Sequence, residues 1–161
     1  MDPRIAPLAE TLRLNTRLFR NCLDGVTGEL AVRRPTPGTN NLALIAAHMT
    51  DARYTILRIL GAPAPNPLAA QLAGARSLDD LASVPTLAET EAAWTAAAHA
   101  LRDRLAVISP TELDANTTTR LPLPDPTVLG TVTFLVQHDS YHLGQLALLR
   151  KYLGLEAMRY T

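Results

Sequence analysis

The residues with the clearest chemical potential are two histidines, His138 and His142, which stand four apart in a mostly apolar stretch. Residues i and i+4 of a helix lie on one face, with Cβ atoms about 5–6 Å apart, so two imidazoles at this spacing can bind one metal ion. The pair shares a stripe at spacings of three and four with Leu135, Leu146 and Leu149, which predicts that it faces a bundle core. Buried imidazole nitrogens need partners, and either neighbouring side chains or a metal can provide them.

A third histidine, His48, lies in another helical stretch, on an apolar stripe with Ile45 and Ile56 that is also expected to face inward. Metal sites in helical bundles are commonly built from side chains on facing helices. His48, His138 and His142 would supply three neutral nitrogens and leave one open position, as in catalytic or substrate-binding sites. All-imidazole ligation suits zinc, nickel, copper or iron, and the sequence does not choose among them. The absence of a carboxylate ligand argues against a di-iron site.

Two polar residues near the histidines are candidates for substrate binding or for orienting a ligand. Gln145 follows His142 by three residues, and facing solvent is an equal alternative for it. Asp51 could accept the second ring hydrogen of a ligand histidine, which fixes the tautomer. Asp139 could serve the same role, but it points about 100° away from His138 around the helix, so we expect it to face solvent or a neighbouring helix.

The composition of the 161-residue chain predicts one globular domain spanning residues 1–161. Hydrophobic residues make up 47% and charged residues 19%, which excludes a disordered chain. The formal net charge is zero, so the basic excess that nucleic acid or an anionic membrane requires is missing. No apolar run could span a bilayer and no secretory signal is visible. With Cys22 as the one cysteine, an internal disulfide is impossible, and we expect a cytoplasmic protein in which Cys22 is simply buried.

Helical periodicity and stop signals predict four long helices, over about residues 3–23, 41–60, 86–108 and 127–154. Thr86 and Glu89 match a capping box at the start of the third helix. His99 lies one residue off the apolar stripe of that helix and is expected at the surface. Tyr54 and Tyr141 could frame a pocket, although core packing is the favoured role. Four amphipathic helices predict an all-α, antiparallel four-helix bundle.

The connections between these helices are rich in proline and polar residues. Proline fixes its own φ and restricts the preceding residue, so such stretches favour loops over helices. We expect loops at 29–38 and 62–66, short helical turns within 68–84 with a weak cap at 77–80, a turn at 109–113, and an extended loop at 114–126 with a short strand at 118–121.

The stretches Asn41–His48 and Gln137–Leu146 together resemble the DinB-like superfamily of damage-inducible metalloproteins. The resemblance covers essentially the whole chain, and the spacing of the three histidines is its most specific part. It implies a DinB-like four-helix bundle with an up-up-down-down order and a long crossover connection, and a homodimer. It also implies that His48, His138 and His142 are the metal ligands.

Family members with known activity are thiol-dependent enzymes, including S-transferases that use bacillithiol or mycothiol and a mycothiol-dependent maleylpyruvate isomerase. The resemblance therefore implies a divalent metal, zinc, nickel or iron, that holds the thiol as a thiolate, the reactive form. The expected function is thiol-dependent S-transfer to an electrophile in stress response or detoxification, with Arg53 and Arg58 as candidates for recognising the thiol. A metal-dependent hydrolase and a non-catalytic protein that binds metal or a small ligand stay open as alternatives.

Overall fold

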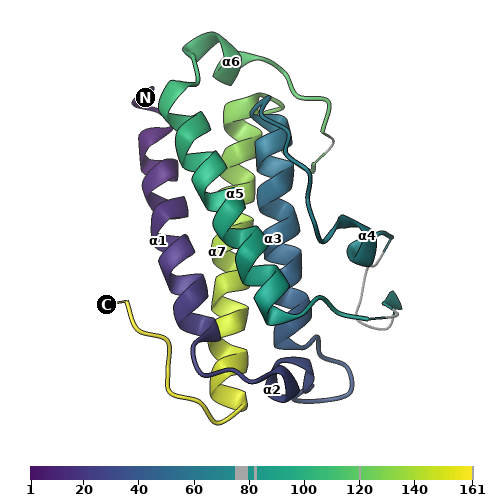
Figure 1. Ribbon diagram of the computed structural model, residues 1–161. Coiled ribbons are helices and arrows are strands. Elements are labelled where there is room, and N and C mark those ends of the chain that lie inside the picture. Colours follow the sequence, from purple (N-terminus) through teal and green to yellow (C-terminus); the bar gives the residue numbers. More distant parts are fainter. Residues whose placement is uncertain (75–79, 82, 120, 161) are drawn as a thin grey trace.

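A computed structural model describes residues 1–74, 80–81, 83–119 and 121–160 of the chain. Four long helices form a bundle and shorter helices lie in the connections between them (Figure 1). The long helices are α1 (Ala6–Leu23), α3 (Leu42–Ile59), α5 (Leu87–Val107) and α7 (Val128–Tyr152), and the short ones are α2 (Gly28–Val32), α4 (Ala69–Leu72) and α6 (Pro110–Asp114). The all-α bundle predicted from periodicity is confirmed, with helix ends within a few residues of those expected.

The long helices run in a down-up-up-down order, with α1 and α7 in one direction and α3 and α5 in the other (Figure 1). Both α1 and α3 pack against α5 and α7. Arg104 of α5 donates a hydrogen bond of 2.6 Å to the carbonyl of Leu60, so the C-terminal ends of the parallel pair α3 and α5 lie together. The long crossover from α3 to α5 is confirmed. The up-up-down-down order is wrong, because α1 and α3 run antiparallel.

Side-chain caps define where the long helices begin. The Asn41 side chain accepts a hydrogen bond of 2.9 Å from the first turn of α3, and the capping box of Thr86 and Glu89 is present at α5. At α7, Thr127 accepts a hydrogen bond of 3.1 Å from the backbone N–H of Gly130. The Asn41 and Thr127 caps fix the starting points of α3 and α7, the helices that carry the three clustered histidines.

Three connections differ from the prediction or lie outside the described residues. Residues 29–32, expected as loop, belong to α2 because Thr27 caps this helix by accepting a hydrogen bond from the backbone N–H of Leu30 and the prolines begin only later. Residues 118, 119 and 121 are not in a strand; an isolated antiparallel bridge joins Asn116 and Thr127 instead, and residue 120 is not described. The weak cap at 77–80 lies outside the described residues, apart from Asp80.

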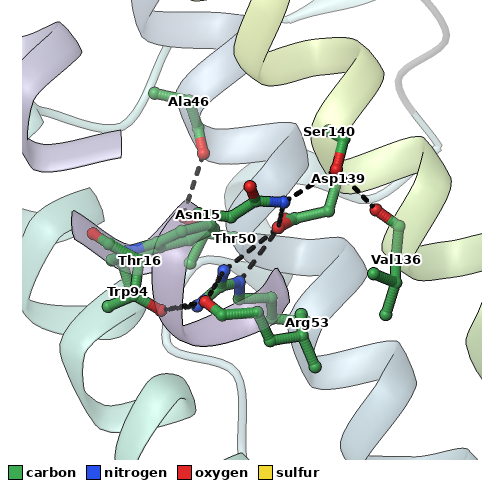
Figure 2. Close-up of polar contacts among 10 residues, drawn as sticks. Asn15, Thr16, Ala46, Thr50, Arg53, Trp94, Val136, Asp139 and Ser140 are labelled. Atoms are coloured by element: carbon green, nitrogen blue, oxygen red, sulfur yellow. Dashed lines mark hydrogen bonds and ion pairs between the residues drawn. The ribbon is translucent and has the colours of Figure 1, made fainter. Parts of the chain in front are cut away.

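Two apolar clusters fill opposite ends of the bundle, with a polar layer between them. One cluster includes Leu113 and Val128 near α6, and the other includes Phe19 and Trp94, whose rings stack with centroids 3.9 Å apart. Cys22 lies buried in the second cluster, as predicted, and burial raises the pKa of its thiol to about 11. The polar layer (Figure 2) is made by Asn15, Thr16, Arg53, Trp94, Asp139 and Ser140. Among the described residues, no helix is both long and apolar enough to cross a membrane.

Candidate metal centre

Three histidine side chains meet on the face of the bundle formed by α3 and α7. The Nε2 atom of His138 lies 3.3 Å from Nε2 of His48 and 3.0 Å from Nε2 of His142. Possible ligand nitrogens of all three lie within 4.8 Å of one another. Two imidazoles on one tetrahedral ion, each about 2.0–2.1 Å from the metal, place their nitrogens about 3.3 Å apart. The structure therefore brings the three predicted residues to spacings that suit a single ion.

The hydrogen bonding of the rings favours a cation between them. His142 Nδ1 lies 2.6 Å from Oε1 of Gln145, so this nitrogen carries the hydrogen and Nε2 keeps its lone pair. Among the described residues, the buried Nδ1 atom of His138 has no hydrogen-bond partner, and an ion on Nε2 would not provide one. Facing nitrogens can share at most one hydrogen per close pair, whereas one cation accepts all three lone pairs together. The donor set therefore fits a divalent metal.

The surroundings of two of the rings favour the neutral imidazole. Partial desolvation and the charge that His142 would carry lower the pKa of His48, although this residue is exposed overall. Desolvation, His142 and His48 together lower the pKa of His138 to about 4. Neutral imidazole is the form that binds a metal, so these two rings are prepared for coordination at neutral pH.

The cluster lies at the edge of the bundle, and the prediction that it faces the core is wrong. His48 is exposed, whereas His138 and His142 are half-buried. Leu146, on the same predicted stripe, is fully buried, so the stripe itself was identified correctly. An apolar stripe of a helix is more than about 100° wide, and residues at its margin reach solvent. The marginal position leaves the centre open to small molecules.

A match to the family model of the DinB superfamily covers residues 11–146, a span that contains all three histidines. The chain belongs to the DinB superfamily. This superfamily includes metalloproteins, with which the three-histidine cluster is compatible. Among solved structures, a conserved protein from Enterococcus faecalis is similar to this DinB-superfamily member, with a TM-score of 0.77. The match covers 92% of this chain and 96% of the Enterococcus faecalis protein. Its 16% sequence identity shows a shared fold only. No curated protein matches the chain.

Of the two supporting residues predicted for this DinB-superfamily site, only Gln145 contacts a histidine. Its Oε1 accepts the hydrogen of His142 Nδ1, and its Nε2 donates a hydrogen bond of 3.1 Å to the Tyr141 hydroxyl. Asp51 accepts a hydrogen bond of 2.7 Å from Asn66, in the connection that follows α3. The orienting role proposed for Asp51 stays a prediction.

Of the remaining candidates, Tyr54 lies in the core, whereas Tyr141 and His99 lie at the surface. Tyr54 is buried and donates a hydrogen bond of 3.2 Å to the carbonyl of Ala93, as core packing predicted. Tyr141 is 58% exposed and its ring lies 5.1 Å from that of His142, so it flanks the centre instead of packing in the core. His99 is exposed on α5, as predicted, and lies outside the cluster.

Asp139 faces neighbouring helices and not solvent, which confirms one of the two positions expected for it, but sequence reasoning missed its ion pair (Figure 2). Its Oδ2 lies 3.0 Å from Nη2 of Arg53, and both side chains are 1% exposed. Burial lowers the pKa of Arg53, and the Asp139 carboxylate beside it counteracts this effect. Arg53 is therefore inaccessible to a thiol cofactor, and that prediction is wrong. Arg58 is exposed, and its role in thiol recognition stays a prediction.

Proposed function

We propose that this protein binds one divalent metal ion through His48, His138 and His142 and uses it to activate a low-molecular-weight thiol. The convergence of three Nε2 atoms on an open face of the bundle is the observation that supports this. Three protein ligands leave a fourth tetrahedral position for an outside molecule. Zinc, nickel and iron all suit imidazole ligands.

The residues around the centre would serve the thiol chemistry in distinct ways. When bound, the ion supplies one effect, which is to lower the pKa of a coordinated thiol so that it is a thiolate at neutral pH. His48 is exposed, which leaves the approach from the α3 side open. Gln145 holds the hydrogen of His142 on Nδ1 and so keeps its Nε2 available. Tyr141, exposed beside His142, presents a phenol to any substrate that enters.

The proposed reaction is S-transfer from bacillithiol or mycothiol to an electrophile, as in detoxification or stress response. The thiol gives its proton to solvent, and its sulfur then forms a bond with an electrophilic carbon. The leaving group departs with the pair of electrons from the bond that breaks. No redox partner is needed, because no atom is oxidised or reduced overall.

Elemental analysis of the purified protein tests the metal site. We expect about one equivalent of zinc, nickel or iron per chain, lost in His138→Ala because two imidazoles bind an ion far more weakly than three. His99→Ala is the matched control, since it removes the one histidine outside the cluster and is expected to keep the metal. Equal metal content in both variants would contradict the assignment.

A thiol panel tests the activity. The metal-loaded protein is mixed with bacillithiol, mycothiol or glutathione and 1-chloro-2,4-dinitrobenzene, and product absorbance is followed. We expect a rate above background with one of these thiols, lost in His138→Ala and kept in His99→Ala. Ester hydrolysis without any thiol would instead identify the hydrolase alternative. If metal binds, neither reaction occurs and a small molecule co-purifies, the non-catalytic alternative is supported.

We also propose that the protein is a homodimer. Leu148 and Tyr152 are each more than half exposed, and their spacing of four places them on one side of α7. Such an exposed apolar stripe supports a protein contact. Sedimentation velocity tests this, with Leu148→Glu expected to shift a dimer to monomer while the metal content is unchanged. A monomeric wild-type protein would refute it.

A further inference from the structure

Arg53 and Asp139, the buried ion pair of the polar layer, lie close in sequence to the histidines of the metal centre, Arg53 on α3 and Asp139 on α7. Asp139 follows His138 directly on α7, and Arg53 lies five residues after His48 on α3. Arg53 Nη2 and Asp139 Oδ2 are 3.0 Å apart, and Arg53 Nε reaches Oδ1 at 3.4 Å. One residue pair thus ties together the two helices between which the ion would bind.

Asp139 is held from two neighbouring helices at once (Figure 2). Asn15 of α1 donates hydrogen bonds of 3.0 Å to Asp139 Oδ2 and to the Ser140 hydroxyl, while Arg53 approaches from α3. Arg53 is itself fixed by a hydrogen bond of 2.6 Å to Thr16 Oγ1. A side chain restrained from both sides limits the rotation of α7 about its axis.

Because α7 is a regular helix, a restraint on Asp139 also fixes the directions in which His138 and His142 point. At 100° per residue, His138 and His142 lie about 100° and 60° from Asp139 in the same rotational sense, so both turn toward one flank of α7. At an outer helix radius of about 5–6 Å, a rotation of about 20° moves a side-chain atom by about 2 Å. Metal sites tolerate ligand displacements of only about 0.2 Å. The rotation of α7 must therefore be set closely for three ligands to meet.

The axial positions agree with the same restraint. His48 lies five residues before Arg53, about 7.5 Å along α3, and His142 lies three residues after Asp139, about 4.5 Å along α7. Because α3 and α7 run antiparallel (Figure 1), these two displacements have the same direction. His48 and His142 therefore lie toward the same end of the bundle from the ion pair, by distances that differ by about 3 Å.

Stability alone does not account for a buried ion pair. Replacing such a pair by apolar residues of similar volume is often neutral or stabilising, because the desolvation of two charges offsets their attraction. In some proteins a buried ion pair instead specifies a single arrangement of the helices that contribute it. We propose that Arg53 and Asp139 are positioning residues of the metal centre, which set the rotation and level of α7 against α3. This inference rests on the proposed metal site.

Cobalt(II) binding by the full chain tests the proposal, because its visible spectrum reports ligand geometry independently of any activity. The main variant is the double substitution Arg53→Met with Asp139→Leu, which removes both charges and keeps an apolar interior. Asp139→Asn is the second variant, in case the double variant does not fold. Leu105→Ala is the control, since it opens a cavity in α5 without a residue of the polar layer. Folding of each protein is checked by circular dichroism.

We expect the double variant and Asp139→Asn to bind cobalt at least tenfold more weakly than wild type, with an altered d–d spectrum. Leu105→Ala should be less resistant to urea yet keep the wild-type cobalt affinity and spectrum. Wild-type affinity and spectrum in a folded pair variant would overturn the positioning role while leaving the metal site intact. An equal loss in Leu105→Ala would also overturn it, because general destabilisation would then explain the result. If the wild-type protein binds no cobalt, the proposed metal site fails, and this inference with it.

Discussion

His138 and Asp139 are neighbours on α7, yet they belong to two polar regions of opposite character. Asp139 is 1% exposed, and its carboxylate accepts hydrogen bonds from both Arg53 and Asn15. His138 is half-buried; within the described part of the chain its Nδ1 has no hydrogen-bond partner, and its Nε2 faces the nitrogens of two other histidines. A rotation of about 100° around one helix separates a satisfied network from an unsatisfied one.

The difference distinguishes structure from function. More than about 90% of buried polar groups in proteins have hydrogen-bond partners, so a group without one requires an explanation. The Asp139 region is complete within the chain and needs nothing from outside. The histidine region has three Nε2 atoms that face one another, and an external cation would give these nitrogens a common partner. Mutations in the Asp139 region should therefore mainly lower folding stability, whereas mutations in the histidine region should mainly weaken metal binding.

Arg53→Ala should have the largest effect on folding. Removal of the guanidinium leaves the Asp139 carboxylate buried without its counter-charge, and such losses cost about 3–5 kcal/mol. The substitution also removes the cation–π contact with Trp94, whose ring centroid lies 3.4 Å from the Arg53 Cζ. Urea denaturation of the metal-free protein measures the change. Arg102→Ala, which breaks an exposed ion pair, should cost less than about 1 kcal/mol; equal losses in the two variants would contradict the comparison.

His48→Ala should show the reverse pattern. This residue is exposed, so the metal-free variant should unfold near the wild-type urea midpoint. Zinc at 100 times its dissociation constant should stabilise the wild-type protein by about 2.7 kcal/mol, and this gain should vanish in the variant. Thermal melts with zinc and then with excess EDTA measure both quantities. His99→Ala should keep the zinc-dependent shift, and a shift retained by His48→Ala would remove it from the ligand set.

Gln145→Leu should produce a smaller, selective loss of metal affinity. Gln145 fixes the His142 hydrogen on Nδ1, and loss of such a contact typically weakens metal binding by 10–100-fold, about 1.4–2.7 kcal/mol. Competition with a chromophoric zinc chelator measures this affinity. Gln137→Leu is the matched control, because Gln137 is exposed on the same helix one residue before His138. Equal affinities of the two variants would show that Gln145 does not orient His142.

Local sequence patterns predicted the four helices and the three histidines, because periodicity and caps act over a few residues. They did not predict the ion pair that buries Asp139 of α7 in the bundle interior, because its partner Arg53 lies 86 residues away in the sequence. A signal was nevertheless present: Arg53 and Asp139 are opposite charges within the two stretches that carry the histidines. The direction of the helices was also beyond local patterns, because it depends on how long connections cross the bundle.

The acid stability of the metal-free protein tests the histidine region alone, and no metal is needed. His138 has a pKa of about 4 in the folded chain, below the ordinary value of 6.5. Between these values the unfolded chain binds a proton that the folded chain does not, so stability is full above pH 6.5 and falls as pH decreases toward 4. Between pH 6.5 and 5 most carboxylates stay ionised in both states, which isolates the histidine contribution. Urea midpoints at these two pH values should therefore differ less in His138→Gln than in wild type, and an unchanged difference would show that this imidazole is not held neutral by its neighbours.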